Sequence, residues 1–427
     1  MNRDPVTIDV VDLHADGYGV AGDGKFGIFG ALPGERVVAA PFTRRKRKTF
    51  ARTLEVELAS ADRVNPICSS AGLCGGCSLQ HMSPQAQLMR KQKTLLDALG
   101  DCRPRDVMSP LMGPVSGYRT KARLGVKLVE KKGKVLVGFR EKMSPYIAEI
   151  ESCEVLAEPV GELIPGLSSL IASLDARSRI PQIEVAIGDD RAALIFRHLD
   201  PLTDADMARF WTFADETGLH VYLQAGGPDS TLLAFPKDAE PCLHYSLPDQ
   251  GLTYKFHPLD FTQINQAINR KLVNRVLELI SPASTDRIAD LFCGIGNFTL
   301  PLAQVAASVV GVEGVPTAVE RARENAVRNG IENCLFSVAD LFASDLDFDL
   351  SDTNKVLLDP PRSGAAAVCE KLASGNVERV VYVSCNPVTL ARDAKSLVEK
   401  GFALETTGVV DMFPHTTHVE SIACFLR

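Results

Sequence analysis

Two residues near the end of the chain have side chains that could carry out covalent chemistry on a pyrimidine. Cys385 closes the apolar run VVYVSC, and Glu420 follows later, in HVESIACFLR. A thiolate that adds to carbon 6 of a uracil makes carbon 5 nucleophilic enough to attack a methyl sulfonium. The proton on carbon 5 must then leave, so a base is required before the thiol can be eliminated. The pair predicts methylation at carbon 5, with Cys385 as nucleophile and Glu420 as base.

The surroundings of Cys385 indicate where its thiol lies. Because Pro387 cannot continue a sheet, we expect a strand that ends at Cys385 and a helix from about Val388. The positive end of that helix dipole is expected to lower the pKa of the thiol. A cysteine in an apolar strand is more often structural than catalytic, so the assignment depends on the motifs upstream.

The upstream segment DLFCGIGNF has the pattern of a strand, a glycine loop and the start of a helix. Gly294 and Gly296 let the backbone turn and approach a ligand, whereas Thr299 stands where a dinucleotide-binding loop has its third glycine. This pattern favours S-adenosylmethionine, which has no pyrophosphate. Glu313 and Asp340 end the next two strands, where one acid could bind ribose hydroxyls and the other an adenine edge. Either acid could instead cap a helix.

A second motif, LLDPPRSG, follows another short apolar run. Asp359 precedes two prolines, which cannot continue a ladder and so fix a loop at the strand end. Methyltransferases that act on amino groups usually have an aromatic residue after such prolines, but here Arg362 follows. This departure favours a carbon target, which needs the covalent help of a thiol.

Three cysteines lie close together in the loop around GLCGGC. Cys68, Cys74 and Cys77 form a C-x5-C-x2-C pattern, and Cys153 is the candidate fourth ligand. Four thiolates suit either zinc or an iron–sulfur centre, and spacing alone leaves both open.

The order of strand-like and helix-like segments along the chain predicts three domains. Residues 1–59, with short alternating strands and many glycines, are expected to form a small closed β-barrel. Residues 60–260 are expected to form a central, mostly antiparallel β domain that carries the cysteine loop, with a helix at 83–100 that could pack on the catalytic domain. Residues 261–427 alternate strands and helices, which predicts an α/β doubly wound parallel sheet with ligands at the carboxyl ends of its strands.

Composition limits the class of protein. The 427 residues are 45% apolar and 23% charged, and they include no long apolar run, so we expect no membrane association. The N-terminal segment lacks the pattern of a secretory signal, so we expect the protein in the cytoplasm. The net charge is −7, yet a basic run at 44–48 and the alternating Arg119, Lys121 and Arg123 could contact phosphates. RNA rather than DNA is the expected partner, and no obligate protein partner is indicated.

The motifs FTQIN, DLFCGIGNF, DPPR, SCNP and HVES, in this order, resemble the RNA uracil-5 methyltransferase family over nearly the whole chain. The resemblance implies a class I S-adenosylmethionine-dependent fold, with Cys385 as nucleophile and Glu420 as base. The segment GYGVAGDGKFGIFGALPGERV is similar to a TRAM domain, an RNA-binding relative of the oligonucleotide-binding fold. The residues that the family resemblance places around the cofactor and the target base are Gln263, Phe292, Asn297, Glu313, Asp340 and Asp359.

The cysteine loop is similar to the 4Fe–4S loop of the ribosomal branch of that family, which implies a 4Fe–4S cluster on Cys68, Cys74, Cys77 and Cys153, and 23S rRNA as the substrate. The alternatives are another uridine of 23S rRNA and the T-loop of tRNA. A different class also stays open, in which the chain is a non-catalytic RNA-binding or redox-sensing factor of ribosome assembly.

Overall fold

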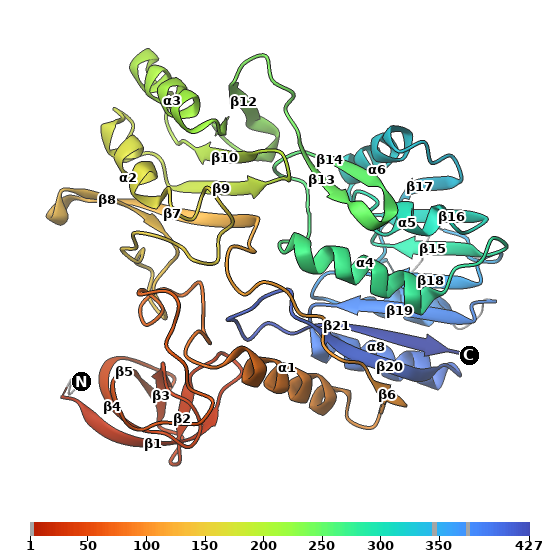
Figure 1. Cartoon of the computed structure of the whole chain (residues 1–427), viewed down its shortest axis with the longest axis horizontal. Helices are drawn as coiled ribbons and strands as arrows, with labels where there is room; N and C mark the ends of the chain where they lie inside the picture. The colour runs from red at the N-terminus through yellow and green to blue at the C-terminus, as the bar shows by residue number, and fades with distance from the viewer. Residues whose placement is uncertain (1–3, 344–347, 373–375) are drawn as a thin grey trace.

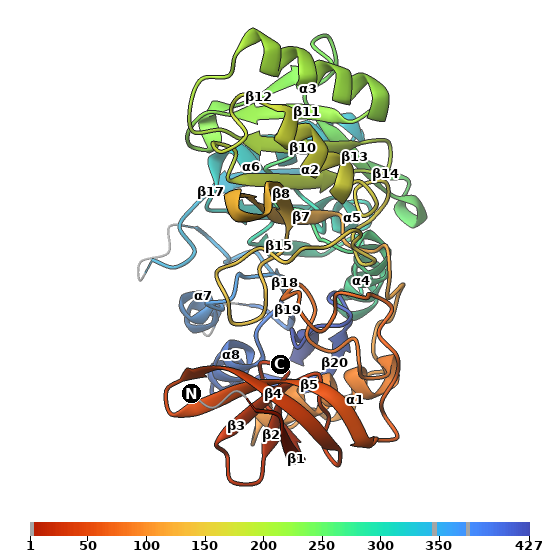
Figure 2. The same cartoon turned by 90° about the vertical axis from the view of Figure 1, so that its left-hand side faces the viewer.

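The computed structural model describes residues 4–343, 348–372 and 376–427. Figure 1 shows a small barrel formed by the N-terminal segment, a sheet from the middle of the chain and a larger sheet from its C-terminal part. In the turned view of Figure 2, the barrel and the middle sheet lie at opposite ends of the molecule. Within the described part of the chain, no helix is both long and apolar enough to cross a membrane.

The barrel is closed, with the strand order β1-β2-β3-β5-β4. Its core holds small and branched side chains such as Ile28, Val37 and Ala51. The basic run lies at the tip of the β4–β5 hairpin, where Lys46 and Arg47 have positive φ. The strands are β1 (Val6–Leu13), β2 (Gly19–Ala21), β3 (Phe26–Phe29), β4 (Arg36–Arg45) and β5 (Lys48–Leu58).

The middle sheet has the order β12-β11-β10-β9-β7-β8 and is antiparallel except for the parallel pair β10–β11. A separate hairpin, β13–β14, packs Tyr245 and Tyr254 into the core of the C-terminal sheet. The elements are β7 (Lys121–Val129), β8 (Lys134–Gly138), α2 (Ile164–Ser173), β9 (Gln182–Ile187), β10 (Ala192–Arg197), α3 (Asp204–Thr217), β11 (His220–Gln224), β12 (Thr231–Phe235), β13 (Leu243–Leu247) and β14 (Leu252–Phe256), with 3₁₀ turns η1 (Glu130–Lys132), η2 (Pro228–Ser230) and η3 (Pro248–Gln250).

The C-terminal sheet has eight strands in the order β17-β16-β15-β18-β19-β21-β20-β6, and only β21 is antiparallel to its neighbours. Helices α4 and α6 cover one face, and α1, α7 and α8 cover the other. The elements are α4 (Gln266–Ile280), β15 (Arg287–Leu291), α5 (Thr299–Ala303), β16 (Ser308–Glu313), α6 (Pro316–Arg328), β17 (Cys334–Val338), β18 (Lys355–Leu358), α7 (Ala366–Lys371), β19 (Arg379–Ser384), α8 (Pro387–Glu399), β20 (Ala403–Val410) and β21 (Glu420–Leu426).

A segment from the N-terminal third of the chain completes this sheet. Helix α1 (Pro84–Leu99) begins at Ser83, whose side chain accepts a hydrogen bond from the backbone N–H of Ala86, and its apolar face joins the core beneath α8. Strand β6 (Asp106–Val107) then pairs in parallel with β20 at the sheet edge. Figure 1 shows α1 beside β20 and α8. Helix α1 and strand β6 thus belong to the C-terminal sheet and its helical cover, although they precede the middle sheet in the chain.

Candidate active site

The pairing of β19 with β21 brings together the nucleophile and the base expected from the sequence. Ser384, the last residue of β19, lies opposite Ser421. Cys385 and Glu420 are the next residues outward on the two strands, so they lie side by side at the carboxyl edge of the sheet. Because β21 runs against its neighbours, the start of this late strand meets the end of an earlier one.

Glu420 is a carboxyl group withdrawn from water. Its side chain belongs to a residue that is 5% exposed. Burial, with a smaller contribution from Asp359, raises the pKa of Glu420 to about 8, while Arg362 opposes the rise. The group therefore gains and loses its proton near neutral pH, as a general base should.

Cys385 is half-buried, and its thiol does not have the lowered pKa that the sequence led us to expect. Helix α8 does begin at Pro387, two residues later. Burial, followed by the carboxyls of Glu420 and Asp359, nevertheless raises the pKa of Cys385 to about 11. The expectation of a lowered pKa is therefore wrong for the protein without ligands, because desolvation and two acids outweigh the end of one helix.

Arg362 supplies positive charge near both the nucleophile and the base. Its carbonyl accepts hydrogen bonds from Asn386 Nδ2 (3.0 Å) and Thr389 Oγ1 (3.3 Å), which ties the DPPR loop to the start of α8. Its guanidinium donates to His418 Nδ1 over 2.9 Å, so the proton of that neutral imidazole is on Nε2. The guanidinium lowers the pKa of Cys385, in opposition to burial. Sequence analysis noted Arg362 without a role and missed His418.

Asp359 and Gln263 meet in front of β18. The backbone N–H of Asp359 donates to Leu291 O (3.3 Å), and Gln263 Nε2 donates to Asp359 Oδ2 (3.4 Å). Burial and the nearby carboxyl of Asp290 raise the pKa of Asp359 to about 7. The amide and the carboxyl together form a polar pair with both donor and acceptor atoms, beside Glu420.

The glycine loop after β15 has the backbone conformation that a close approach to a ligand requires. Gly294 and Gly296 have φ of 54° and 89°, and Phe292, with φ of 67°, adopts the left-handed region although it is bulky. Such residues are found mainly where the surrounding structure holds them for a function. Glu313 fixes the loop, because its Oε2 accepts from Gly294 N–H (3.2 Å) and its Oε1 from Val315 N–H (3.0 Å).

Asp290, at the end of β15, is a functional candidate that sequence analysis treated only as the end of a strand. It is fully buried, Oδ2 accepts from Thr299 Oγ1 (2.5 Å), and Oδ1 has no partner. Burial raises the pKa of Asp290 to about 7. Thr299, which we had read only as the absence of a glycine, is thus the partner of this acid. An acceptor without a partner beside a glycine loop fits a cationic group such as the ammonium of S-adenosylmethionine.

Two of the predicted cofactor residues use their side chains within the protein. Asn297 Oδ1 accepts from Tyr245 OH (2.9 Å) and Asn269 Nδ2 (3.0 Å), which ties the glycine loop to β13 and α4. Asp340 is exposed, and its Oδ1 accepts from the N–H of Phe342 (2.9 Å). The ring of Phe342 lies 5.5 Å from that of Phe292. Direct contact of Asn297 and Asp340 with a ligand stays a prediction.

The four cysteines expected to bind a metal centre, Cys68, Cys74, Cys77 and Cys153, line one small cavity. Cys74 Sγ accepts a hydrogen bond from Gly76 N–H (3.4 Å). Lys142 lies near these thiols, and burial lowers its pKa to about 8 while Cys74 opposes that change. Among the described residues, no group of three or more His, Cys, Asp or Glu side chains is arranged to hold a metal ion.

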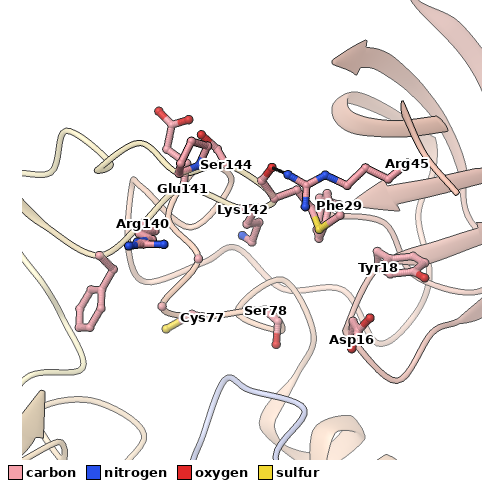
Figure 3. Close-up of a pocket in the computed structure, with 15 residues that line it drawn as sticks. Asp16, Tyr18, Phe29, Arg45, Cys77, Ser78, Arg140, Glu141, Lys142 and Ser144 are labelled. Atoms are coloured by element: carbon pink, nitrogen blue, oxygen red, sulfur yellow. Dashed lines mark hydrogen bonds between the residues drawn. The ribbon is translucent and has the colours of Figure 1, made fainter. Parts of the chain in front are cut away.

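A larger cavity, of about 690 Å³, separates the barrel from the cysteine loop. Figure 3 shows that Tyr18, Phe29 and Arg45 line it from the barrel, while Cys77 and Lys142 line it from the other side. The Arg45 guanidinium crosses the gap and donates to a backbone carbonyl, Met143 O (3.0 Å). The basic run therefore borders this cavity through Arg45.

The three basic residues expected on one strand face do not all face solvent. Lys121 Nζ donates to Pro258 O (2.8 Å) and Asp260 O (2.5 Å), and burial lowers its pKa to about 8. Arg119 lies over the ring of Phe139, at 5.5 Å, while Arg123 is exposed and pairs with a glutamate. The expected phosphate contact is therefore wrong for Lys121, which joins the middle sheet to the loop before α4.

Known proteins match this chain over most of its length. The family described as tRNA (uracil-5-)-methyltransferase matches residues 85–427. The 23S rRNA (uracil(1939)-C(5))-methyltransferase RlmD of Hahella chejuensis is 48% identical over 434 residues, covering 99% of this chain and 97% of that protein. The protein of the same name from Alkalilimnicola ehrlichii is 48% identical, covering 100% of this chain and 97% of that protein.

A solved structure also matches the whole fold. The Pyrococcus abyssi tRNA (uracil-54, C5)-methyltransferase in complex with S-adenosyl-L-homocysteine covers 99% of this chain and 100% of its own, with a TM-score of 0.75 and 25% identity. This chain is an S-adenosylmethionine-dependent methyltransferase and belongs to the tRNA (uracil-5-)-methyltransferase family.

Proposed function

We propose that this protein methylates carbon 5 of one uridine in 23S rRNA, with S-adenosylmethionine as the methyl donor. The observation that carries the proposal is the adjacency of Cys385 and Glu420, fixed by the β19–β21 register, in front of Asp359. The choice of RNA is supported by the relatives at 48% identity, whose printed names specify uracil 1939 of 23S rRNA.

The reaction uses Cys385 first. The thiol loses its proton to solvent, with Arg362 stabilising the thiolate, and sulfur bonds to carbon 6 of the uracil. The electron pair of the 5,6 double bond moves toward carbon 5 and the oxygen on carbon 4. Carbon 5 then attacks the methyl carbon of S-adenosylmethionine, and the bond from that methyl to the sulfonium breaks to leave S-adenosylhomocysteine. Glu420 removes the carbon 5 proton, the double bond forms again, and the carbon–sulfur bond breaks to release Cys385 as thiolate.

In this proposal, Asp359 and Gln263 orient the uracil ring. A uracil edge presents an N–H between two carbonyl oxygens. The Asp359 carboxylate can accept from that N–H, and the amide of Gln263, which already bonds Asp359, can donate to a carbonyl. The uridine must leave its stack to reach this edge, which is cheap in a single-stranded RNA loop.

S-adenosylmethionine, when bound, supplies an electrophilic methyl group on a sulfonium. In the proposal, Asp290 receives the ammonium of the ligand, while Glu313 and Asp340 lie where ribose and adenine are expected. Phe292 and Asn297 shape the glycine loop that follows Asp290. The positive φ of Phe292 and the unpaired Oδ1 of Asp290 support this placement.

The cysteine loop is proposed to hold a 4Fe–4S cluster on Cys68, Cys74, Cys77 and Cys153. The four cysteines line one cavity, and a 4Fe–4S cluster takes one thiolate on each of its irons. The N–H to sulfur bond at Cys74 and the nearby Lys142 suit a negatively charged cluster.

The barrel is proposed to act as a TRAM domain that holds the RNA. Its exposed hairpin tip, with Lys46 and Arg47, continues into the cavity lined by Arg45 and Tyr18. Contacts of this kind would make binding strongly dependent on salt concentration.

The first test is mass spectrometry of 23S rRNA fragments from cells with and without the gene. Loss of one methyl group on one uridine would establish the reaction and its site. Loss of the methyl group on another 23S uridine would change the site only, and an unchanged 23S profile would direct the search to the T-loop of tRNA. Unchanged profiles in both RNAs would favour a non-catalytic assembly factor.

A second test addresses the covalent step with the purified protein. Glu420→Gln should trap RNA on the protein as a slow band on a denaturing gel, because the adduct forms but cannot lose its proton. Cys385→Ala should give no band and no methylation, although it binds S-adenosylhomocysteine. Methylation by Cys385→Ala would contradict the mechanism.

A further inference from the structure

We propose that Gln87, on α1, is a positioning residue for the base Glu420, and that it acts by clamping the segment Asp411–His418 against the cysteine loop. We call this stretch the pre-base segment. The inference rests on the proposed function, because it concerns the step in which the base removes a proton. It explains why a helix from the N-terminal third of the chain carries a buried polar residue toward the catalytic edge.

The first half of the clamp joins Gln87 to His415. The backbone N–H of His415 donates to Gln87 Oε1 (2.8 Å), and Gln87 Nε2 lies 3.3 Å from His415 Nδ1. The same Nε2 donates to Leu79 O (3.1 Å) and Met82 O (2.8 Å), which end the cysteine loop. Gln87 is 2% exposed, so no water competes for these bonds. One amide therefore connects the cysteine loop, α1 and the pre-base segment.

The second half of the clamp comes from the cysteine loop. The backbone N–H groups of Ser78 and Leu79 both donate to His415 O, each over 2.9 Å. Ser78 directly follows Cys77, and Figure 3 shows that both residues line the cavity that separates the cysteine loop from the barrel. His415 is thus held through its N–H on one side and through its carbonyl on the other.

His415 needs this restraint. Its φ is 63°, in the left-handed region that is uncommon for residues with a Cβ, although histidine is found there more often than most. Tyr118 adds a further bond, from its hydroxyl to Pro414 O (2.9 Å). Without these external partners, the pre-base segment would relax toward a more common backbone conformation.

The clamp is directly connected to the base. Between the pre-base segment and Glu420 stands only Val419, which is buried. His418, the last residue of the segment, accepts a hydrogen bond from the guanidinium of Arg362. Cys385, in contrast, lies between β19 and α8, and the bonds of Gln87 and His415 given above reach neither of these elements. A loosened clamp should therefore displace Glu420 more than Cys385, and slow proton removal more than addition.

The test compares Gln87→Leu with Gln85→Leu in the full-length protein. Gln85 lies on the exposed side of the same helix, so the control makes the same change outside the clamp. We expect Gln87→Leu to release tritium from 5-tritiated uridine RNA about 10–100-fold more slowly, the usual cost of a displacement of about 1 Å. The covalent adduct should accumulate on a denaturing gel, and affinity for S-adenosylhomocysteine should match that of the control.

Hydrogen–deuterium exchange provides a second readout that does not depend on activity. The amides of His415, Ser78 and Leu79 should exchange faster in Gln87→Leu than in Gln85→Leu. If Gln87→Leu does not fold, Gln87→Glu carries the same prediction with a smaller effect, because it keeps the acceptor for His415 but loses the donors to Leu79 and Met82.

The outcomes separate the two proposals. If Glu420→Gln traps the adduct while the Gln87 variants turn over like the control and keep His415 protected, the clamp is wrong and the proposed function stands. If neither the wild type nor Glu420→Gln forms an adduct with any uridine RNA, the proposed function itself fails.

Discussion

Lys91 Nζ lies 2.7 Å from Asp411 Oδ1, and the two side chains are only 2% and 8% exposed. The same ammonium donates to Phe413 O over 2.8 Å. Burial lowers the pKa of Lys91, and Asp411 opposes that change. The ion pair joins α1 to the pre-base segment one helical turn after Gln87. A buried pair of this kind contributes little net stability, but it is costly to break on one side only.

Lys91→Met should therefore destabilise the protein by about 3–5 kcal/mol, because Asp411 is left as an unpaired buried charge. The double variant Lys91→Met/Asp411→Leu should recover much of that loss. Urea unfolding measures both, and Lys93→Met is the matched control, since Lys93 is exposed and its pair with Asp97 should change stability by less than about 0.5 kcal/mol. A double variant as unstable as Lys91→Met would argue against the pair as the cause.

Proton removal should depend on pH through Glu420. The pKa of this carboxyl is raised to about 8 by burial, so the base form is scarce at pH 6 and predominates above pH 8. Tritium release from 5-tritiated uridine RNA should rise about tenfold per pH unit below pH 7 and level off above about pH 8. Glu420→Gln should abolish that release at every pH. A release rate that is flat between pH 6 and 8 would contradict this assignment.

Asp290 should make the unliganded protein less stable as pH rises. Burial raises the pKa of Asp290 to about 7, while the unfolded chain ionises near 3.9. The contribution of Asp290 to stability is complete below about pH 4, where both states are protonated, and it falls by up to about 1.4 kcal/mol per pH unit as pH rises toward 7.

Asp290→Asn should flatten this slope, because the amide keeps the Thr299 bond and does not titrate. Denaturant unfolding at pH 5, 6 and 7 measures it. Asp97→Asn, on the exposed face of α1, should leave the slope unchanged. An unchanged slope in Asp290→Asn would show that the buried acid is not its source.

Arg362 should control the reactivity of Cys385. Arg362→Met removes the cation that opposes the raised pKa of the thiol, and a shift of one further pKa unit would slow alkylation by iodoacetamide at pH 8 about tenfold. Arg362→Lys keeps the charge and should restore part of the rate, although it loses the planar contact with His418. Equal alkylation rates in Arg362→Met and the wild type would remove Arg362 from the mechanism.

Much of the catalytic sheet could be predicted from the sequence because its strands are continuous apolar runs that end in polar residues. The runs before Asp290, Asp359 and Cys385 are strands in the structure, and all three residues meet at one edge. Because the carboxyl ends of parallel strands lie at the same edge of an α/β sheet, the sequence pattern was sufficient to predict this meeting. The adjacency of Cys385 and Glu420 needed more, because only the antiparallel direction of β21 creates it.

Long-range pairing and desolvation could not be predicted. The bonds from Gln87 to His415 join residues 328 positions apart, and the raised pKa of Cys385 depends on burial that no spacing reveals. One signal was available: Gln87 and Lys91 are polar residues four apart on the same side of a helix as Leu88 and Leu95. A polar stripe within an apolar helix face indicates buried partners.

The parallel pairing of β6 with β20 also sets an order of events on the ribosome. About 300 residues separate these two strands, which at about 5–20 residues per second corresponds to roughly 15–60 s of synthesis. For that time α1 has emerged without the strands and helix that cover Leu88, Leu95 and Leu99. The nascent chain therefore exposes an apolar helix face until its last strands are made, and this is the period in which a chaperone has most to protect.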